Sequence, residues 1–181
     1  MSSKNFLYIG IGSQNINLKP KDFERTWAQD LMLKINDDWN IWACDPRYYS
    51  DKMLKAIENS NWIDHFLPLD ICDEWSNVPL FDAWNCTSVL EHVKKEKANN
   101  FIVGLRSKVS YDSMGYIHID LSDHNLTHES SIYYEKKDKY YRSYLNKITK
   151  DEWLNIIDKH FVYSRCKSTL DRVSLYDVKV K

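Results

Sequence analysis

Short apolar runs alternate with amphipathic segments over the first hundred residues, and this alternation strongly narrows the folds open to the chain. The expected strands are residues 6–9, 40–44, 65–69, 82–87 and 100–105. Strands separated by helices are joined by right-handed crossovers, which make the strands parallel and place the helices against the sheet. The pattern therefore predicts an α/β fold, a Rossmann-like and mainly parallel sheet with helices on both faces.

The segments between these runs carry helix signals. After Pro20, apolar residues recur every four positions over residues 23–35, which is the spacing of a helix with one apolar face. Ser50 is a suitable N-cap for a second helix. Ser88 and Glu91 have the spacing of a capping box, so we expect a third helix to begin there.

The C-terminal part departs from this alternation. Thr149 and Glu152 form a second capping-box pattern ahead of an apolar helix. Residues 161–166 and 173–180 then predict a C-terminal antiparallel hairpin. Residues 107–147 are rich in Tyr, Asp, Lys and His and are longer than an ordinary connection. We interpret this segment as a lid or a substrate-facing insert.

Length and charge exclude several classes of protein. A chain of 181 residues, 43% of them hydrophobic, has material for one sizeable core, so residues 1–181 are expected to form a single domain. The formal net charge of -1 gives no overall attraction to nucleic acid, so no nucleic-acid partner is implied, although a local basic patch is still open. The apolar run at residues 6–11 is far shorter than the ~20 residues of a membrane span. We therefore expect neither a membrane anchor nor a signal peptide.

The cysteines are scattered and form no Cys-x-x-Cys pair. They are Cys44, Cys72, Cys86 and Cys166. This pattern favours buried free thiols over a disulfide framework. Because thiols stay reduced in the cytoplasm, we expect the protein to be cytoplasmic.

Three of the predicted strands end on residues suited to binding a ligand. The first runs into a glycine-containing loop at residues 10–13, the second ends at Asp45 and the third ends at Asp70. In an open parallel sheet, ligands bind beyond the carboxyl ends of the strands, and a carboxylate after the second strand can accept both ribose hydroxyls. The loop lacks the third glycine of a dinucleotide site and the Gly-Lys-Ser/Thr of a triphosphate loop. Both of those ligand classes are therefore disfavoured.

The chain resembles the class I S-adenosylmethionine-dependent methyltransferases, in particular the small methyltransferase type 11-like enzymes. The most specific match is residues 81–93, because a Phe-Asp start and a Val-Leu-Glu-His-Val ending recur in that family. Residues 6–13 are similar to its glycine-rich first motif, and a weaker similarity covers residues 116–124 and 144–154. One departure is Tyr8, which stands where the family usually has an acid.

The resemblance implies S-adenosylmethionine as the cofactor. Asp45 matches the family's ribose-binding acid, and residues 69–71 resemble its adenine-edge motif. The implied cofactor-binding residues are Gly10, Gly12, Ser13, Asp45, Asp70, Ile71, Asn85, Cys86, Thr87 and Ser88.

The implied reaction is methyl transfer to a small or medium-sized acceptor. Since the sulfonium methyl is already an activated electrophile, the protein mainly aligns it with the acceptor. An oxygen or nitrogen acceptor also needs a base, and His is the side chain best poised near neutral pH. His92 more often serves packing or capping in the family. The catalytic candidates are His92, His118, Asp120, Asp123 and His124.

Three alternatives stay open at this stage. Tyr8 favours a catalytically silent domain of the same fold that acts as a binding or partner subunit. Residues 118–124 contain His and Asp, which are metal ligands, so a metal-dependent hydrolase is a further reading, although one contiguous patch rarely completes a metal shell. Residues 133–144 interleave aromatic and basic side chains, which fits stacking on a nucleotide or sugar acceptor or, as we prefer, an amphipathic cover.

Overall fold

The computed structural model describes residues 4–10, 38–44, 51–60, 62–67, 75, 78–122 and 146–181. The strands are β1 (Lys4–Ile9), β2 (Trp39–Cys44), β3 (His65–Leu67), β4 (Phe81–Thr87), β5 (Val109–Asp120), β6 (Phe161–Val162), β7 (Arg165–Ser168) and β8 (Arg172–Val180). The helices are α2 (Asp51–Glu58), α3 (Ala98–Lys108) and α5 (Lys150–Ile157), with two short 3₁₀ helices, η3 (Leu90–His92) and η4 (Lys95–Lys97).

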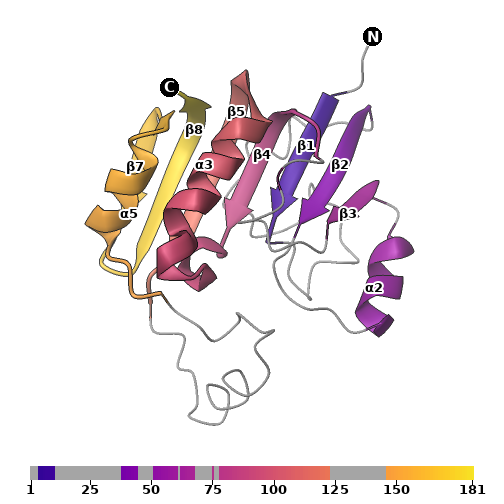
Figure 1. Cartoon of the computed structure of the whole chain (residues 1–181), viewed down its shortest axis with the longest axis horizontal. Coiled ribbons are helices and arrows are strands. Elements are labelled where there is room, and N and C mark those ends of the chain that lie inside the picture. The colour runs from indigo at the N-terminus through magenta and orange to yellow at the C-terminus, as the bar shows by residue number, and fades with distance from the viewer. Residues whose placement is uncertain are drawn as a thin grey trace.

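The strands form one mixed sheet in the order β3-β2-β1-β4-β5-β8-β6, and β7 also pairs with β8 (Figure 1). Strands β1 to β5 are parallel, whereas β8 is antiparallel to β5, β6 and β7. This arrangement confirms the predicted parallel sheet with an antiparallel C-terminal hairpin. The chain runs outward from β1 to β3 and then returns to β4 on the other side of β1. Strand order therefore reverses between β1 and β4.

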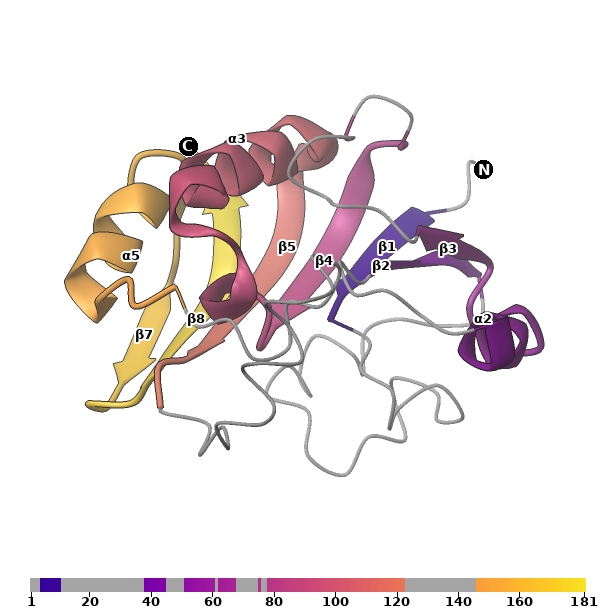
Figure 2. The same ribbon diagram turned by 60° about the horizontal axis from the view of Figure 1, so that its bottom comes forward.

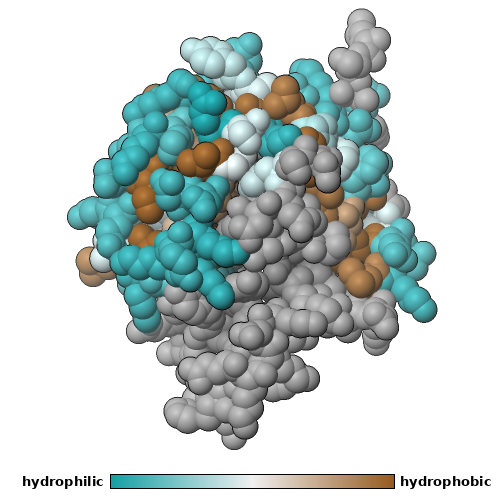
Figure 3. Space-filling model, in the orientation of Figure 1, coloured by the Kyte–Doolittle hydropathy of each residue, from teal (hydrophilic) through white to brown (hydrophobic). Residues whose placement is uncertain are grey.

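Successive side chains of each strand point to opposite faces of the sheet, and each face has its own core. On one face, Leu7, Trp84 and Ile117 pack in a cluster with residues of α3 and α5. On the other face, Phe6 and Tyr116 pack in a cluster with residues of α2. Figure 2 shows α2 next to β3 and away from α3 and α5. Figure 3 shows mainly hydrophilic side chains on the outer surface of α3 and α5. Helices therefore cover both faces, as predicted.

The prediction of a strand at residues 100–105 is wrong, because this run lies inside α3. Its buried residues Phe101, Ile102 and Leu105 follow helical spacing on one face. The fifth strand is instead Val109–Asp120, which lies between β4 and β8 in the sheet. That part of the segment 107–147 is therefore a central strand and neither a lid nor an insert.

The capping box predicted at Ser88 and Glu91 is also wrong. The N-cap of the short η3 helix is Val89, and no side-chain hydrogen bond caps it. Ser88 has a φ of 52°, and its N–H donates to the carbonyl of His118 at 3.0 Å. Ser88 is therefore still bonded to the sheet, and the cap position falls one residue later on Val89, whose side chain has no hydrogen-bonding group.

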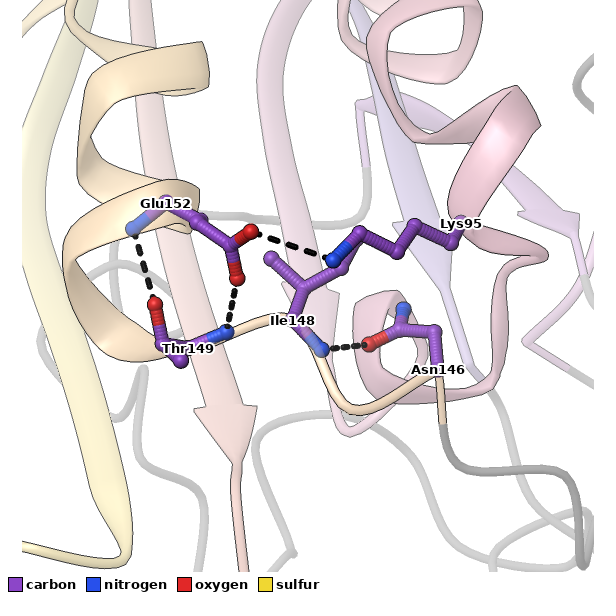
Figure 4. A network of polar contacts seen from close by, with 5 residues as sticks. All are labelled: Lys95, Asn146, Ile148, Thr149 and Glu152. Carbon is purple, nitrogen blue, oxygen red and sulfur yellow. Dashed lines mark hydrogen bonds and ion pairs between the residues drawn. The ribbon is translucent and has the colours of Figure 1, made fainter.

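The second capping box is confirmed. Thr149 Oγ1 accepts from the N–H of Glu152 at 3.3 Å, and Glu152 Oε2 accepts from the N–H of Thr149 at 2.8 Å. Lys95 from η4 makes an ion pair with the same carboxylate at 3.1 Å (Figure 4). The start of α5 is therefore joined to the segment that precedes α3.

Several sequence predictions concern other residues. Cys44 and Cys86 are buried free thiols as expected, whereas Cys166 is exposed because it lies on β7 at the sheet edge. Among the described helices, none is long and apolar enough to cross a membrane. The expected helix after Pro20, Cys72, and residues 133–144 lie outside the described residues.

The capping box gives a stability prediction. Thr149→Ala removes the acceptor for the N–H of Glu152, so we expect the free energy of unfolding to fall by ~1 kcal/mol in urea denaturation. Thr149→Ser keeps the hydroxyl and is the matched control, which should stay close to wild type. An equal loss in both variants would contradict the capping role.

Candidate functional site

The carboxyl ends of β1, β2 and β4 meet around Gly10. The N–H of Gly10 donates to the carbonyl of Cys44 at 2.9 Å, which extends the pairing of β1 with β2. Gly10 has a φ of +89°, and a Cβ at this position would lie 2.5 Å from both Thr87 O and Val89 Cγ2. Only glycine adopts this positive φ without strain and also lacks the Cβ that would clash here. The structure thus brings Gly10 against the end of β4, and the sequence assigned both to one site.

Residues 85–88 divide between the two faces of the sheet. Asn85 is buried opposite Tyr8 and Tyr116, and its Oδ1 accepts from Thr87 Oγ1 at 2.5 Å. Cys86 points into the core on the opposite face, where burial raises the pKa of its thiol. Only its backbone is therefore available to a ligand at this edge.

His118 and Asp120 lie on one face of β5, as the sequence predicted. His118 is 1% exposed, and its Nδ1 lies 2.9 Å from Ser174 Oγ. Burial lowers the pKa of His118 to about 4, with the charge of Asp120 acting in the opposite direction, so its ring is neutral at neutral pH. Asp120 Oδ1 accepts from the N–H and the hydroxyl of Ser122 at 3.0 and 2.6 Å.

His92 is the last residue of η3, the short turn between β4 and α3. Its N–H donates to the carbonyl of Val89 at 2.9 Å, and its side chain is half-buried. The η3 turn lies beside β5. His92 therefore belongs to the turn that follows Ser88 at the candidate site.

Glu91 is a buried carboxyl group that the sequence analysis assigned only to a cap. It is 2% exposed, and neither of its oxygens has a hydrogen-bond partner with good geometry among the described residues. Burial raises its pKa to about 8, with a further contribution from the charge of Asp120, while the backbone N–H groups of Glu91 and Asp120 oppose the shift. Glu91 is therefore largely protonated at neutral pH.

Asn146 fixes the turn that carries Glu91, and nothing in the sequence pattern indicated this role. Its Nδ2 donates to the carbonyls of Leu90 and Val93 at 2.7 and 2.8 Å. Its backbone N–H donates to the carbonyl of Glu91 at 2.9 Å. Its Oδ1 accepts from the N–H of Ile148 at 3.0 Å (Figure 4). Through these hydrogen bonds, Asn146 joins the turn after β4 to the segment that leads into α5.

Tyr8 stands at the position where the resemblance leads one to expect an acid. Its side chain is buried in the cluster with α2, where its ring meets Trp62 edge-on with centroids 6.2 Å apart. An ionised carboxylate would be costly in such surroundings, so this local environment suits the aromatic residue present.

The remaining candidates lie outside the described residues. They are Gly12, Ser13, Asp45, Asp70, Ile71, Asp123 and His124. In the part of the chain that the structure describes, no three His, Cys, Asp or Glu side chains are grouped so that they could hold a metal ion.

The burial of Glu91 predicts a pH-dependent stability. Its ordinary pKa of 4.5 applies in the unfolded chain, whereas the folded value is about 8. As the pH rises from about 5 to 8, the unfolded state releases this proton and the folded state retains it, so wild type should lose stability relative to Glu91→Gln. The difference in the free energy of unfolding between Glu91→Gln and wild type, measured by urea denaturation, should change by up to ~1.4 kcal/mol per pH unit.

Glu152→Gln is the control for this measurement. The pKa of exposed Glu152 is lowered, chiefly by the N–H of Thr149, so its contribution is lost only at pH values below the ordinary carboxyl pKa. The difference in the free energy of unfolding between Glu152→Gln and wild type should stay constant over the same pH range. A flat difference for Glu91→Gln as well would show that Glu91 ionises in the folded protein as it does in the unfolded chain.

No family model and no curated protein matches the chain. Several solved structures are similar to it over nearly its whole length. An S-adenosylmethionine-dependent methyltransferase from Clostridium acetobutylicum aligns with a TM-score of 0.60 and 12% identity, covering 99% of this chain and 85% of the other. A TehB-like S-adenosylmethionine-dependent methyltransferase from Corynebacterium glutamicum gives 0.63 and 7%, covering 100% and 82%.

The N-methyltransferase NodS from Bradyrhizobium japonicum, solved in complex with S-adenosyl-L-homocysteine, gives a TM-score of 0.58 and 10% identity, covering 98% of this chain and 79% of that chain. At these identities the likeness shows the fold. Together with the strand order and the antiparallel hairpin, it confirms the architecture that the sequence predicted. The chain has the class I fold of the S-adenosylmethionine-dependent methyltransferases.

Proposed function

We propose that the chain binds S-adenosylmethionine at the carboxyl ends of β1, β2 and β4 and transfers its methyl group to a small or medium-sized acceptor. The observation that carries this proposal is the close approach of Gly10 to Thr87. It lies where strand order reverses, the point at which open parallel sheets bind ligands. The methyltransferase fold of the chain supports the same reading.

The residues that follow β1, β2 and β3 in the sequence are of types that suit an adenosyl ligand. Gly12 and Ser13 follow Gly10 in the glycine loop, and we assign them to the methionine and ribose. Asp45 directly follows Cys44, whose carbonyl accepts from Gly10. The sequence therefore provides a carboxylate for the ribose hydroxyls next to the strand partner of the glycine. Asp70 and Ile71 follow the third strand in sequence, and we assign them to the adenine.

The end of β4 supplies polar groups for the methionine part of the ligand. We assign this role to Asn85, Thr87, Ser88 and the backbone of Cys86. The Thr87 hydroxyl already donates to Asn85, so the two side chains hold each other in place. Ser88 is exposed at the strand end, where it can reach a ligand without displacing the core.

S-adenosylmethionine supplies a methyl group that its sulfonium charge already activates. The contribution of the chain is therefore to align the acceptor and, for an oxygen or nitrogen acceptor, to remove a proton. We assign proton removal to His118, because its ring is neutral and its backbone is bonded to Ser88. Further candidates for proton removal are Asp120, His92, Asp123 and His124.

The second candidate function is a catalytically silent domain that serves as a binding or partner subunit. The observation that favours it is Tyr8, since the buried aromatic ring provides no charge for the ligand amino group. The two candidates differ in whether the cofactor binds.

Calorimetric titration with S-adenosylmethionine and with its demethylated product separates the two candidates. We expect binding, and we expect Asp45→Asn to weaken it by about tenfold or more, because a ribose hydrogen bond to a charged acceptor contributes ~1.5–3 kcal/mol. Asp112→Asn, an exposed acid at the start of β5, is the control and should bind like wild type. Absence of binding at millimolar ligand would favour the silent domain.

A further inference from the structure

Two rows of polar and aromatic side chains cross four strands on one face of the sheet. Residues that are directly paired in neighbouring strands point to the same face, and the pairing is continuous from β4 through β5 and β8 to β7. Tyr176 packs in the cluster with residues of α2, so this face is the one opposite to α3 and α5. The first row is Thr87, His118, Ser174 and Lys167, and the second row is Asn85, Tyr116, Tyr176 and Arg165.

The outer end of both rows is exposed and lies near the edge of the sheet that carries the candidate site. Arg165 and Lys167 on β7 are exposed, whereas His118 and Tyr116 in the middle are 1% and 2% exposed. β7 runs parallel to β5, because both strands are antiparallel to β8. Its carboxyl end, which follows Lys167, therefore lies at the same edge as the end of β4. Neighbouring strands are ~4.8 Å apart, so three strand spacings, or ~14 Å, separate Lys167 from Thr87.

The ring of Tyr176 holds the guanidinium group of Arg165. The guanidinium carbon lies 3.9 Å from the centroid of this ring, and Lys167 Nζ lies 5.9 Å from the same centroid. The ring is itself fixed, because it meets the buried ring of Tyr116 edge-on with centroids 5.2 Å apart. A guanidinium over an aromatic face can still donate from the N–H groups at its edge, and its restricted motion lowers the entropy cost of binding a ligand.

No carboxylate of the described residues neutralises these two cations. Neither Arg165 nor Lys167 makes an ion pair with another described residue. Asp177, which follows Tyr176 in the sequence, instead accepts from the hydroxyl of Ser164 at 2.6 Å. Two like charges beside one ring repel each other, and an anion bound between them replaces this repulsion with attraction. The geometry and the charge thus favour an anionic ligand.

We propose that Arg165 and Lys167 bind an oxyanion, a carboxylate or phosphate group, that is carried by the methyl acceptor. The fork of N–H donors on Arg165 fits a group with two oxygens, and Lys167 supplies a second charge. The link to the acceptor rests on the proposed function, and it is supported by the shared edge of β7 and β4. One medium-sized molecule can span that separation, so the proposal narrows the acceptor to an acidic small molecule.

Titration of the full ¹⁵N-labelled chain with inorganic phosphate and with acetate tests the site without cofactor. At constant ionic strength, set with chloride, we expect saturable shifts of the Arg165 side-chain N–H signal and of the backbone N–H signals of residues 165–167. Arg165→Gln and Lys167→Gln should each weaken the response about threefold or more. Both side chains are exposed, so these variants should fold. Shifts that do not saturate, or that chloride alone reproduces, would overturn the proposal.

Arg106→Gln is the matched control. Arg106 is an exposed arginine on α3, the helix that covers the other face of the sheet. This variant should respond to phosphate and acetate like wild type. A loss of the same size would mean that the anions act through the overall charge of the protein, which would overturn the site.

Uridine monophosphate, a longer phosphate probe, tests the link to the acceptor, with uridine at the same concentration as its neutral control. We expect the monophosphate to shift the N–H signals of Ser88 and His118 as well as those of β7, and uridine to shift neither set. Shifts confined to β7 would overturn the assignment to the acceptor. A response to a single-stranded oligonucleotide without any response to phosphate or acetate would instead indicate a nucleic-acid surface and overturn the proposal.

Calorimetric titration with S-adenosylmethionine separates this proposal from the proposed function. Arg165→Gln should bind the cofactor like wild type, because Arg165 is assigned to the acceptor alone. If phosphate titrates Arg165 while wild type binds no cofactor, the anion site stands and the methyl-transfer function fails. If the cofactor binds and no anion does, the proposed function stands and the anion site fails.

Discussion

The parallel pairing of β1 with β2 on one side and with β4 on the other is the constraint on which the rest of the structure depends. Three strands that run in one direction therefore end at the same edge, where Gly10 lies against the end of β4. Only glycine fits at this position, because a side chain there would meet Thr87 and Val89.

Most of the sheet could be predicted from the sequence, because β1, β2 and β4 are short apolar runs followed by residues that favour turns. The wrong predictions concern segments in which the local hydrophobic pattern fits more than one kind of secondary structure. Residues 100–105 are apolar enough for a strand, and only their continuation from Ala98 to Lys108 shows the helical period. The first half of β5 is polar, and a register irregularity interrupts its pairing with β4. Simple alternation is lost there, so the strand looked like part of a loop.

The candidate site was predictable only in part, for a different physical reason. Strand-end residues such as Gly10 and Thr87 stand out in the sequence because turn chemistry is local. Ser174 lies 56 residues from His118 in the sequence, and the hydrogen bond between them forms only because β5 pairs with β8. Glu91 has the spacing of a cap residue in the sequence, whereas in the structure Ser88 is bonded to the sheet and Glu91 is buried.

The hydrogen bonds of Asn146 make one cooperative unit of two segments that are far apart in the sequence. Its side chain and backbone hold three carbonyls of the turn at residues 90–93. The energies of substitutions at Asn146 and in that turn should therefore not add, as is usual for residues that share partners. Variation in the turn and variation at the entrance to α5 are thus coupled: a change at one alters which changes the other tolerates.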